Sequence, residues 1–256
     1  VGQGECIVIK TGANSAIMMD CGSSSDERFL EDDVLPFLKE EGITTLSGIF
    51  VSHADKDHIC GVPELIESKS HIKIKRIYLP KIKDKNNYYK KTVFLAKDKG
   101  IPVTYVERKD VFKFGKLKLL CLAPSYKTLS GDSNKDSLIL LLKMPNDIDV
   151  LLTGDSDVSA QEHVLSDIER LSNGRVEILK VAHHGSKNST SQKLVESENP
   201  KLAIISAGKH NSYGHPHKEV TEILRNNKTI SFSTKDGGEI DIFTRGKRFF
   251  ARSFCH

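Results

Sequence analysis

The sequence predicts an α/β fold, namely a four-layer αββα sandwich in which two mixed β-sheets pack face to face under outer helices. Two observations lead to this prediction. Short apolar runs of strand length recur throughout the 256 residues, and amphipathic segments with helical spacing separate several of them. Strands come first, then alternate with helices, and then return. No linker rich in Pro, Gly or Ser interrupts this order, so we expect residues 1–256 to form a single domain.

The predicted strands are runs of apolar and often β-branched residues. Several of them are apolar almost without interruption, which is typical of strands that are covered on both faces. We expect strands at residues 6–9, 16–19, 49–51, 77–79, 117–122, 138–142, 150–152, 178–181 and 202–206.

Helical periodicity appears between these strands. Gly42 is a plausible C-terminal cap for the first helical segment, although Pro36 leaves the start of that helix undecided. Asp157 can cap the second helix, which Asn173-Gly174 would end, and Pro216 precedes the third. The predicted helices cover residues 30–38, 158–171 and 217–226.

The C-terminal part is predicted to contain a β-hairpin. Residues 229–233 and 240–243 have strand-like composition, and the turn residues 236–238, Asp-Gly-Gly, lie between them. We therefore expect these two segments to pair with each other.

The composition is that of an ordinary globular protein and contains no membrane-spanning pattern. No apolar stretch approaches the roughly 20 residues that a transmembrane helix needs, and no signal-peptide pattern opens the sequence. A start at Val1 is compatible with a piece of a longer protein or with a processed product. The cysteines are scattered without CxxC spacing, which argues against a disulfide framework. We expect Cys21, Cys60 and Cys121 to be buried packing residues.

The basic residues are unevenly distributed. The formal net charge of +4 is too small to indicate a nucleic-acid partner by itself. Residues 69–91, however, are rich in Lys and contain few acidic residues. Two interpretations stay open for this stretch, a solvated loop and a surface that contacts backbone phosphates.

The segment VSHADKDHICG, residues 51–61, carries four groups that can bind a metal ion. His53, Asp55, Asp57 and His58 follow a predicted buried strand directly, in the kind of loop where ligands commonly bind. Such groups would be costly to bury without partners. Imidazole and carboxylate together suit zinc, manganese or iron. The sequence therefore predicts a metal site here.

Polar clusters also lie next to later strands. Each alone has an ordinary explanation, such as a helix cap for Asp155, a hydrogen-bonded core residue for His183, or a turn around Gly214. Their recurrence beside successive strands favours one shared site. The clusters are Asn134-Lys135-Asp136-Ser137, Thr153-Gly154-Asp155, His183-His184-Gly185-Ser186 and Tyr213-Gly214-His215-Pro216-His217.

These motifs resemble the metallo-β-lactamase superfamily, and within it the metallo-β-lactamase domain of the ComEC proteins of bacterial DNA uptake. The sequence departs from the commonest superfamily pattern at Asp55, where a second histidine usually stands. A further histidine, usual before the Asp155 strand, is absent, and residues 134–137 stand near its place. The motifs that carry the resemblance are VGQGE (1–5), MMDCGSS (18–24), SHADKDH (52–58), LLTGD (151–155), KVAHHGSKNST (180–190) and YGHPH (213–217).

The resemblance implies a site for two divalent ions, zinc or manganese, which activate a shared water as hydroxide. Asp155 would bridge the ions through its two carboxylate oxygens, and Asp20 would orient a ligand histidine from beneath. The implied ligands are His53 and Asp55 for one ion, Asp57, His58 and one of the paired histidines for the other, and Asp155 for both. His184 is preferred over His183 as that ligand, and His183 stays open as the alternative.

Further residues are expected to act on the substrate. With His184 as the ligand, His183 would support the ligands or face the substrate. Lys180, Lys187, His215 and Ser186 are candidates for holding a phosphate or stabilising a leaving oxygen, with a snorkelling surface position as the alternative for Lys180. The expected catalytic set is Asp57, His183, His215 and Lys187.

The resemblance implies metal-dependent hydrolysis of a phosphodiester, and specifically a nuclease that degrades the DNA strand that is not imported. Two alternatives stay open. One is a hydrolase of small esters, lactams or phosphorylcholine-type diesters, which a tight, enclosed pocket would favour. The other is a non-catalytic binding module that keeps the metal as a structural clip.

The expected partner is DNA, single-stranded in the leading hypothesis. A ComEC domain would be attached to the outer face of the bacterial cytoplasmic membrane through a transmembrane portion of the same longer chain. A free-standing relative would be soluble. The sequence leaves the oligomeric state open.

Overall fold

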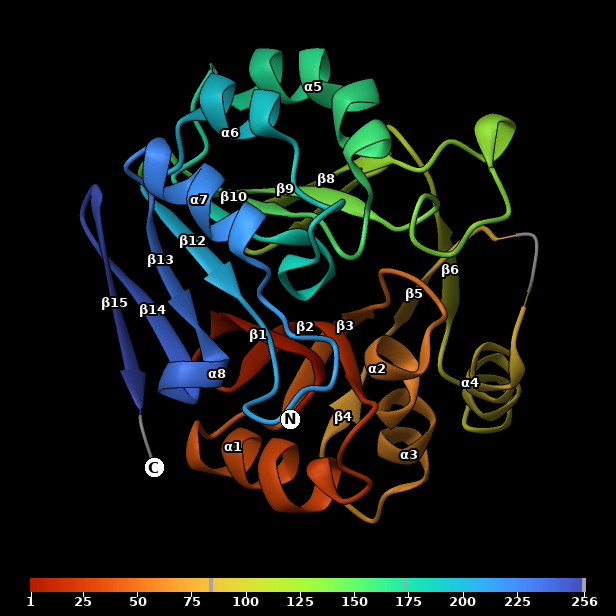
Figure 1. The fold of residues 1–256 in the computed structure, drawn as a ribbon. Helices are drawn as coiled ribbons and strands as arrows, with labels where there is room; N and C mark the ends of the chain where they lie inside the picture. Colours follow the sequence, from red (N-terminus) through yellow and green to blue (C-terminus); the bar gives the residue numbers. More distant parts are fainter. Residues whose placement is uncertain (83–84, 173, 255–256) are drawn as a thin grey trace.

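Two mixed β-sheets pack face to face in the computed structural model, which describes residues 1–82, 85–172 and 174–254 (Figure 1). Helices α1, α3 and α4 cover the outer face of one sheet, and α5, α6 and α7 cover the outer face of the other. The layers therefore follow the order helix, sheet, sheet, helix. The predicted αββα sandwich is confirmed.

The first sheet has the strand order β1-β2-β3-β5-β6, and β4 pairs with β3. β1 and β2 are antiparallel, whereas the other neighbours are parallel. Its strands are β1 (Gly4–Gly12), β2 (Ser15–Ser23), β3 (Thr45–Phe50), β4 (Lys73–Ile74), β5 (Ile77–Pro80) and β6 (Val103–Val106).

The second sheet has the strand order β13-β12-β11-β10-β9-β8-β7. The pairs from β7 to β10 are antiparallel, and the pairs from β10 to β13 are parallel. Its strands are β7 (Val111–Phe114), β8 (Leu117–Ala123), β9 (Ile139–Met144), β10 (Ile148–Leu152), β11 (Ile178–Lys180), β12 (Leu202–Ile205) and β13 (Ile230–Ser233).

The helices pack through apolar residues at helical spacing. On α5, for example, Val164 and Ile168 lie four residues apart and face the second sheet. One turn of π-helix, Leu30–Val34, leads into α1. The helices are α1 (Leu35–Glu40), α2 (Lys56–Ile59), α3 (Gly61–Glu67), α4 (Asn87–Asp98), α5 (Val158–Ser172), α6 (Gln192–Glu198), α7 (Lys218–Asn226) and α8 (Thr234–Gly237), with 3-10 turns at Tyr126–Thr128 and Ala182–Gly185.

β9 shows why some strands are apolar without interruption. Leu140 and Leu142 face the first sheet, where they join the core around Phe50 and its stacked neighbour Tyr78. Leu141, between them, faces the helices of the outer layer. Because successive side chains of a strand point to opposite faces, a strand between two apolar layers needs apolar residues at every position.

The predicted hairpin at the C-terminal end is wrong in its pairing. β13 pairs in parallel with β12 and completes the second sheet. The expected turn residues form the short helix α8 instead. β14 (Glu239–Arg245) pairs with β15 (Arg248–Phe254), so a hairpin exists but lies one strand later in the sequence. The strand at residues 229–233 is confirmed as β13, and only its pairing was mispredicted, because an Asp-Gly-Gly segment suits a tight turn and a helix end equally well.

Most of the other predicted strands and helices are observed. Each predicted strand overlaps an observed one, and α5 and α7 match the second and third predicted helices. α5 ends at Ser172, while Asn173 lies outside the described residues. The first predicted helix is split between the π-helical turn and α1, with Pro36 in the first turn of α1, where proline is tolerated. Cys21, Cys60 and Cys121 are buried as predicted.

The lysine-rich stretch, residues 69–91, is not simply a loop. Within its described part, β4 and β5 belong to the first sheet, and α4 begins at Asn87. Its residues therefore combine buried strand positions such as Leu79 with exposed lysines. The loop interpretation is corrected for these segments, and phosphate contact stays a proposal.

Candidate metal centre

The first cluster of candidate ligands leaves β3 at one edge of the first sheet. Asp55 occupies the N-terminal cap position of α2, so the following residues turn back toward the sheet. His53 and His58 are completely buried, and Asp57 is partly buried. Gly22 of β2 permits this approach, because a Cβ there would clash with the backbone of Asp57 and His58.

Asp20 lies beneath this cluster and fixes both histidines. Its carboxylate accepts hydrogen bonds from the backbone N–H of Ser52 (2.6 Å), the hydroxyl of Ser52 (2.7 Å) and Nδ1–H of His58 (2.8 Å). The Ser52 oxygen in turn accepts Nδ1–H of His53 at 2.9 Å. With each Nδ1 donating, the Nε2 atom of each ring carries a free lone pair. Asp20 thus has the orienting position that the resemblance implied.

Asp155 follows a strand of the second sheet and lies close to His53 and His58 of the first. Asp155 follows β10 through Gly154, which has a φ of +49°, a conformation that glycine adopts without strain. The backbone N–H of Asp155 donates to the hydroxyl of Ser137 at 3.1 Å. The carboxylate is therefore held by a tight turn and is almost completely buried.

His183 and His184 follow β11 and both have left-handed backbone conformations, with φ values of 49° and 54°. This conformation is unfavourable for residues with a Cβ and is found mainly where function requires it. The N–H of His183 donates to the carbonyl of Gly154 (3.1 Å), and Nδ1–H of His184 donates to the carbonyl of Ser206 (2.8 Å). Because Nδ1 of His184 donates to Ser206, its Nε2 carries the free lone pair, as in His53 and His58.

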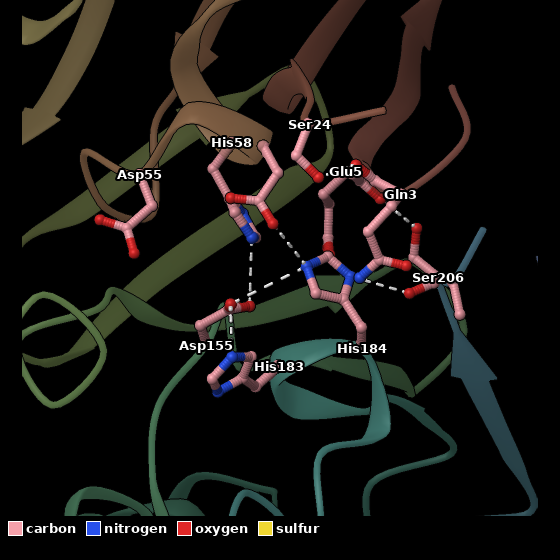
Figure 2. A network of polar contacts seen from close by, with 12 residues as sticks. Gln3, Glu5, Ser24, Asp55, His58, Asp155, His183, His184 and Ser206 are labelled. Atoms are coloured by element: carbon pink, nitrogen blue, oxygen red, sulfur yellow. Dashed lines mark hydrogen bonds and ion pairs between the residues drawn. The ribbon is translucent and has the colours of Figure 1, made fainter. Parts of the chain in front are cut away.

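Asp155 lies where these groups meet, as Figure 2 shows. Its Oδ1 is 3.2 Å from Nε2 of His58. Its Oδ2 is 3.9 Å from Nε2 of His53 and 3.9 Å from Nε2 of His184. Nε2 of His184 also lies 3.3 Å from Oδ2 of Asp57. Side chains as far apart in the sequence as Asp57 and His184, 127 positions, are thus brought within contact distance.

Two sets of three donor atoms are close enough to share an ion. Within each set, all donor atoms lie within 4.8 Å of one another. Ligands held at about 2.0–2.1 Å from one ion lie roughly 3–3.5 Å apart, so small side-chain shifts suffice for binding. Among the described residues the two sets are His53, His58 and Asp155, and Asp57, His58 and His184.

The donor atoms themselves indicate a cation. Nε2 of His53, His58 and His184, together with Oδ1 of Asp155, are buried and have no hydrogen-bond partner among the described residues. Leaving buried polar atoms unpaired costs free energy, and several such atoms converging on one point are rare. Imidazole nitrogens and carboxylate oxygens fit a divalent metal ion.

The electrostatics agree with a cation at this position. Burial alone would raise the pKa of Asp155, but the surrounding histidines, His58 first, hold the pKa well below its usual range. Burial alone would lower the pKa of His58, yet the carboxylates of Asp155 and Asp20 raise it well above its usual value. The carboxylates therefore favour positive charge at the position of His58 Nε2.

Asp55 is the most exposed of the candidate ligands. Its side chain is 47% exposed, and its Oδ2 lies 3.6 Å from Nε2 of His53. Its Oδ1 accepts a hydrogen bond from the hydroxyl of Ser133 at 2.7 Å. Sequence reasoning missed Ser133, which stands immediately before the cluster at residues 134–137. A lone serine carries no signal, because serine is common in any surface loop.

The structure places the expected catalytic residues at different depths. His183 is 34% exposed and reaches 3.8 Å from Asp155. His215 is buried beside His183 and His184, with ring centroids 5.9 and 6.2 Å away. Burial and these histidines lower the pKa of His215 to about 4. Lys187 is exposed, and its ammonium group has no hydrogen bond or ion pair within the described part of the chain.

Lys180 has neither of the two positions expected for it. Its side chain is buried, and its Nζ lies 2.6 Å from Oε2 of Glu5 on β1 and donates to the carbonyl of Val181 at 2.9 Å. A lysine whose charge is neutralised inside the protein cannot hold a substrate phosphate. The partner of Lys180 could not be predicted from the local pattern, because Glu5 lies 175 positions away.

The two packed sheets and the His/Asp cluster at their common edge define a metal-binding hydrolase fold. The model of the metallo-β-lactamase superfamily matches residues 1–117. Residues 1–117 are therefore similar to this superfamily.

Comparison with curated relatives shows similarity to proteins of the ComEC type. The chain is 33% identical over 210 residues to ComE operon protein 3 of Bacillus subtilis, in an alignment that covers 82% of this chain and 26% of that protein. It is 29% identical over 244 residues to Recombination protein 2 of Haemophilus influenzae, covering 94% of this chain and 28% of that protein. Similarity to the ComEC-type competence proteins is confirmed.

A solved structure supports the fold independently. The metallo-β-lactamase fold protein YhfI from Bacillus subtilis aligns with a TM-score of 0.53 at 10% identity, covering 90% of this chain and 88% of that one. Identity at this level shows the shared fold alone.

The chain spans about a quarter of the length of the curated relatives that it matches. None of the helices in the described ranges combines the length and apolar character needed to cross a bilayer.

Proposed function

We propose that this chain is a metal-dependent phosphodiesterase that degrades DNA during competence-related uptake. The observation that carries the proposal is the group of buried, unpartnered donor atoms that both sheets direct at Asp155. Similarity of residues 1–117 to the metallo-β-lactamase superfamily supports a hydrolytic reaction. Relatives named for competence and recombination support DNA as the substrate.

We assign the ligand roles from the buried donor atoms that have no hydrogen-bond partner among the described residues. Asp155 would contact both ions, because its two oxygens lie next to histidines from different elements. Its carboxylate contacts His53 of the first donor set, His184 of the second, and His58, which belongs to both. In this assignment His53 and Asp55 complete the first site, and Asp57, His58 and His184 complete the second.

Two divalent ions would supply an activated water and neutralise charge on the phosphate. The residues of the chain would orient the substrate around them. His183, partly exposed beside Asp155, would donate a hydrogen bond to a phosphate oxygen. Nδ1 of His215 has no hydrogen-bond partner among the described residues, and its ring lies 5.9 Å from that of His183, so His215 would contact the leaving oxygen. Lys187, exposed on the same loop, is available to a neighbouring phosphate.

Exposure supports one side of the site as the side of substrate approach. Asp55 is the most exposed of the candidate ligands, and His183 beside Asp155 is 34% exposed. The lysine-rich stretch borders this opening, because the side chain of Asn86 donates to the carbonyl of Ala54. Nearby, Nζ of Lys85 lies over the ring of Tyr105, which is exposed. Lysines and exposed rings beside the opening support a polyanionic substrate with unpaired bases.

The test is release of nucleotides from single-stranded DNA with added Mn²⁺. We expect metal-dependent cleavage by the wild-type chain and at least about a hundredfold loss in an Asp155→Ala/His58→Ala variant, since activation of water depends on the ions. An Asp98→Ala variant is the matched control, because Asp98 is exposed at the end of α4. Equal cleavage by the double variant would refute the proposal.

The same assay separates the two alternatives. Turnover of a small ester or lactam without any cleavage of DNA would support the small-molecule hydrolase. Metal binding without turnover of either substrate would support the structural clip.

We also propose that the chain acts outside the cytoplasmic membrane, attached to it through another part of a longer protein. The proposal is supported by the similarity to ComEC-type proteins and by the small share of their length that this chain spans. Protease accessibility in intact spheroplasts of a host that expresses the longer protein would test it.

A further inference from the structure

The β14–β15 hairpin lies outside both sheets of the sandwich and has two unlike faces. Ile242, Phe249 and Ala251 on one face pack against the end of the second sheet. Because paired residues of antiparallel strands share a face, the opposite face is formed by four other pairs. We call this face the hairpin stripe: Glu239 with Phe254, Asp241 with Arg252, Phe243 with Phe250, and Arg245 with Arg248.

Aromatic rings and a guanidinium group alternate along the hairpin stripe. Phe243 and Phe250 are 47% and 43% exposed, although their rings stack on each other with centroids 5.4 Å apart. The guanidinium of Arg252 lies 5.7 Å from the centre of the Phe243 ring and 4.8 Å from that of Phe254. Flat surfaces of this kind accept further rings by stacking.

The outer end of the stripe carries positive charge without compensation. Arg245 and Arg248 stand directly opposite each other, and like charges in this position destabilise a strand pair. Neither arginine has an ion pair or hydrogen bond within residues 1–82, 85–172 and 174–254. Lys247 between them pairs with Asp147. The two guanidinium groups are therefore available to bind an anion from outside the chain.

Helix α8 connects the inner end of the stripe to segments near the metal centre. α8 joins β13 to the hairpin, and Nζ of its Lys235 donates to the carbonyl of His215 at 3.4 Å. The hydroxyl of Thr234 bonds to the backbone of Ala207, close to the segment that anchors His184. The stripe thus begins next to α8 and runs toward Arg245 and Arg248.

We infer that the hairpin stripe binds single-stranded DNA, with bases on the phenylalanine rings and phosphates at the arginine pair. The inference rests on the proposed function for its choice of nucleic acid. A single strand is favoured over a duplex because only unpaired bases can stack on exposed rings. Single-stranded DNA is favoured over a protein partner because the stripe combines an arginine pair, which binds anions, with exposed rings, on which bases can stack. Each nucleotide of a DNA strand supplies both a phosphate and a base.

The test measures binding of fluorescein-labelled oligothymidylate by anisotropy in EDTA, where metal-dependent cleavage does not occur. We expect a Phe243→Ser/Phe250→Ser variant to bind about tenfold more weakly or worse, since each stacked base contributes substantially to affinity. We expect Arg245→Ala/Arg248→Ala to lower the slope of log Kd against log salt concentration by about 1.4, or roughly 0.7 for each phosphate contact. Binding of duplex DNA should be little changed by loss of the two rings.

Phe94→Ser is the matched control, because Phe94 is 70% exposed on α4, away from the hairpin. It should bind like the wild-type chain. Unchanged oligothymidylate affinity in both hairpin variants, or no measurable binding by the wild-type chain, would overturn the inference and leave the stripe as a contact surface for a protein.

Hydrolysis of bis(p-nitrophenyl) phosphate with Mn²⁺ separates this inference from the proposed function. This small diester does not reach the stripe, so the hairpin variants should hydrolyse it at the wild-type rate. Absence of hydrolysis by every variant and by the wild-type chain would count against the proposed function while leaving the binding result intact.

Discussion

At the scale of single residues, Ser133 explains how an exposed carboxylate can serve as a ligand. Asp55 could rotate freely in water, which would weaken its hold on an ion. The Ser133 hydroxyl holds Oδ1 and leaves Oδ2 beside His53. The loop that carries Ser133 is itself fixed, since Asp136 accepts hydrogen bonds from the backbone of Ser130 and Gly131.

Ser133→Ala should therefore weaken metal binding without changing any proposed ligand. Loss of an orienting hydrogen bond costs metal sites about 10- to 100-fold in affinity. Titration with Mn²⁺, followed by the electron paramagnetic resonance signal of the free ion, measures the change. Ser159→Ala is the control, because the exposed Ser159 bonds to an aspartate outside the candidate site. Identical Mn²⁺ binding by both variants would show that Ser133 has no orienting role.

The sequence was sufficient to predict residues whose chemistry stands out. Four potential ligands within six positions cannot be explained by packing, and His53 and His58 indeed converge with Asp155. Lys180 and Ser133 could not be assigned, because their roles depend on partners far away in the chain. A charged residue inside a strand has the same local pattern whether its partner is water, substrate or a buried glutamate.

At the scale of elements, the Glu5–Lys180 ion pair links β1 of the first sheet to β11 of the second. Both side chains are almost completely buried. A second contact supports the same junction, because the hydroxyl of Ser206 donates to the carbonyl of Gly4. Removing one partner of a buried pair leaves an uncompensated charge, whereas removing both leaves none.

Lys180→Met should lower the free energy of unfolding by about 3–5 kcal/mol, since Glu5 would then be buried alone. The double variant Glu5→Gln/Lys180→Met should recover most of this loss. Urea denaturation provides the measurement. Lys10→Met is the matched control, because Lys10 forms an exposed ion pair with Glu41 at 2.9 Å, and loss of this pair should cost less than about 1 kcal/mol. An equal, small cost for Lys180→Met and Lys10→Met would refute the structural role of the buried pair.

Element prediction succeeded where one physical requirement dominated. The long apolar run at residues 138–142 could only be a strand covered on both faces, and β9 is such a strand. It failed for the C-terminal end because pairing partners are chosen by the whole fold. β13 pairs in parallel with β12 at the edge of the second sheet, instead of forming the predicted antiparallel pair with residues 240–243.

At the scale of the whole molecule, the candidate metal centre joins the two sheets at one edge. His53 and His58 come from the first sheet, and Asp155 and His184 come from the second. Without a cation, the centre brings several carboxylates together around buried, unpartnered nitrogens. Bound ions would remove that cost and hold the sheets together at this edge.

Metal binding should therefore raise the melting temperature of the chain. Ions present at about a hundred times their Kd add roughly 2.7 kcal/mol to the free energy of unfolding. Differential scanning calorimetry in EDTA, Mn²⁺ and Zn²⁺ would show the shift and rank the two metals. Asp155→Ala should abolish the shift, because it removes the carboxylate that contacts both sites, whereas Asp98→Ala should retain it. A melting temperature that neither metal raises would mean that the donor atoms of the two sheets do not close around an ion, and the proposed function would fall with that result.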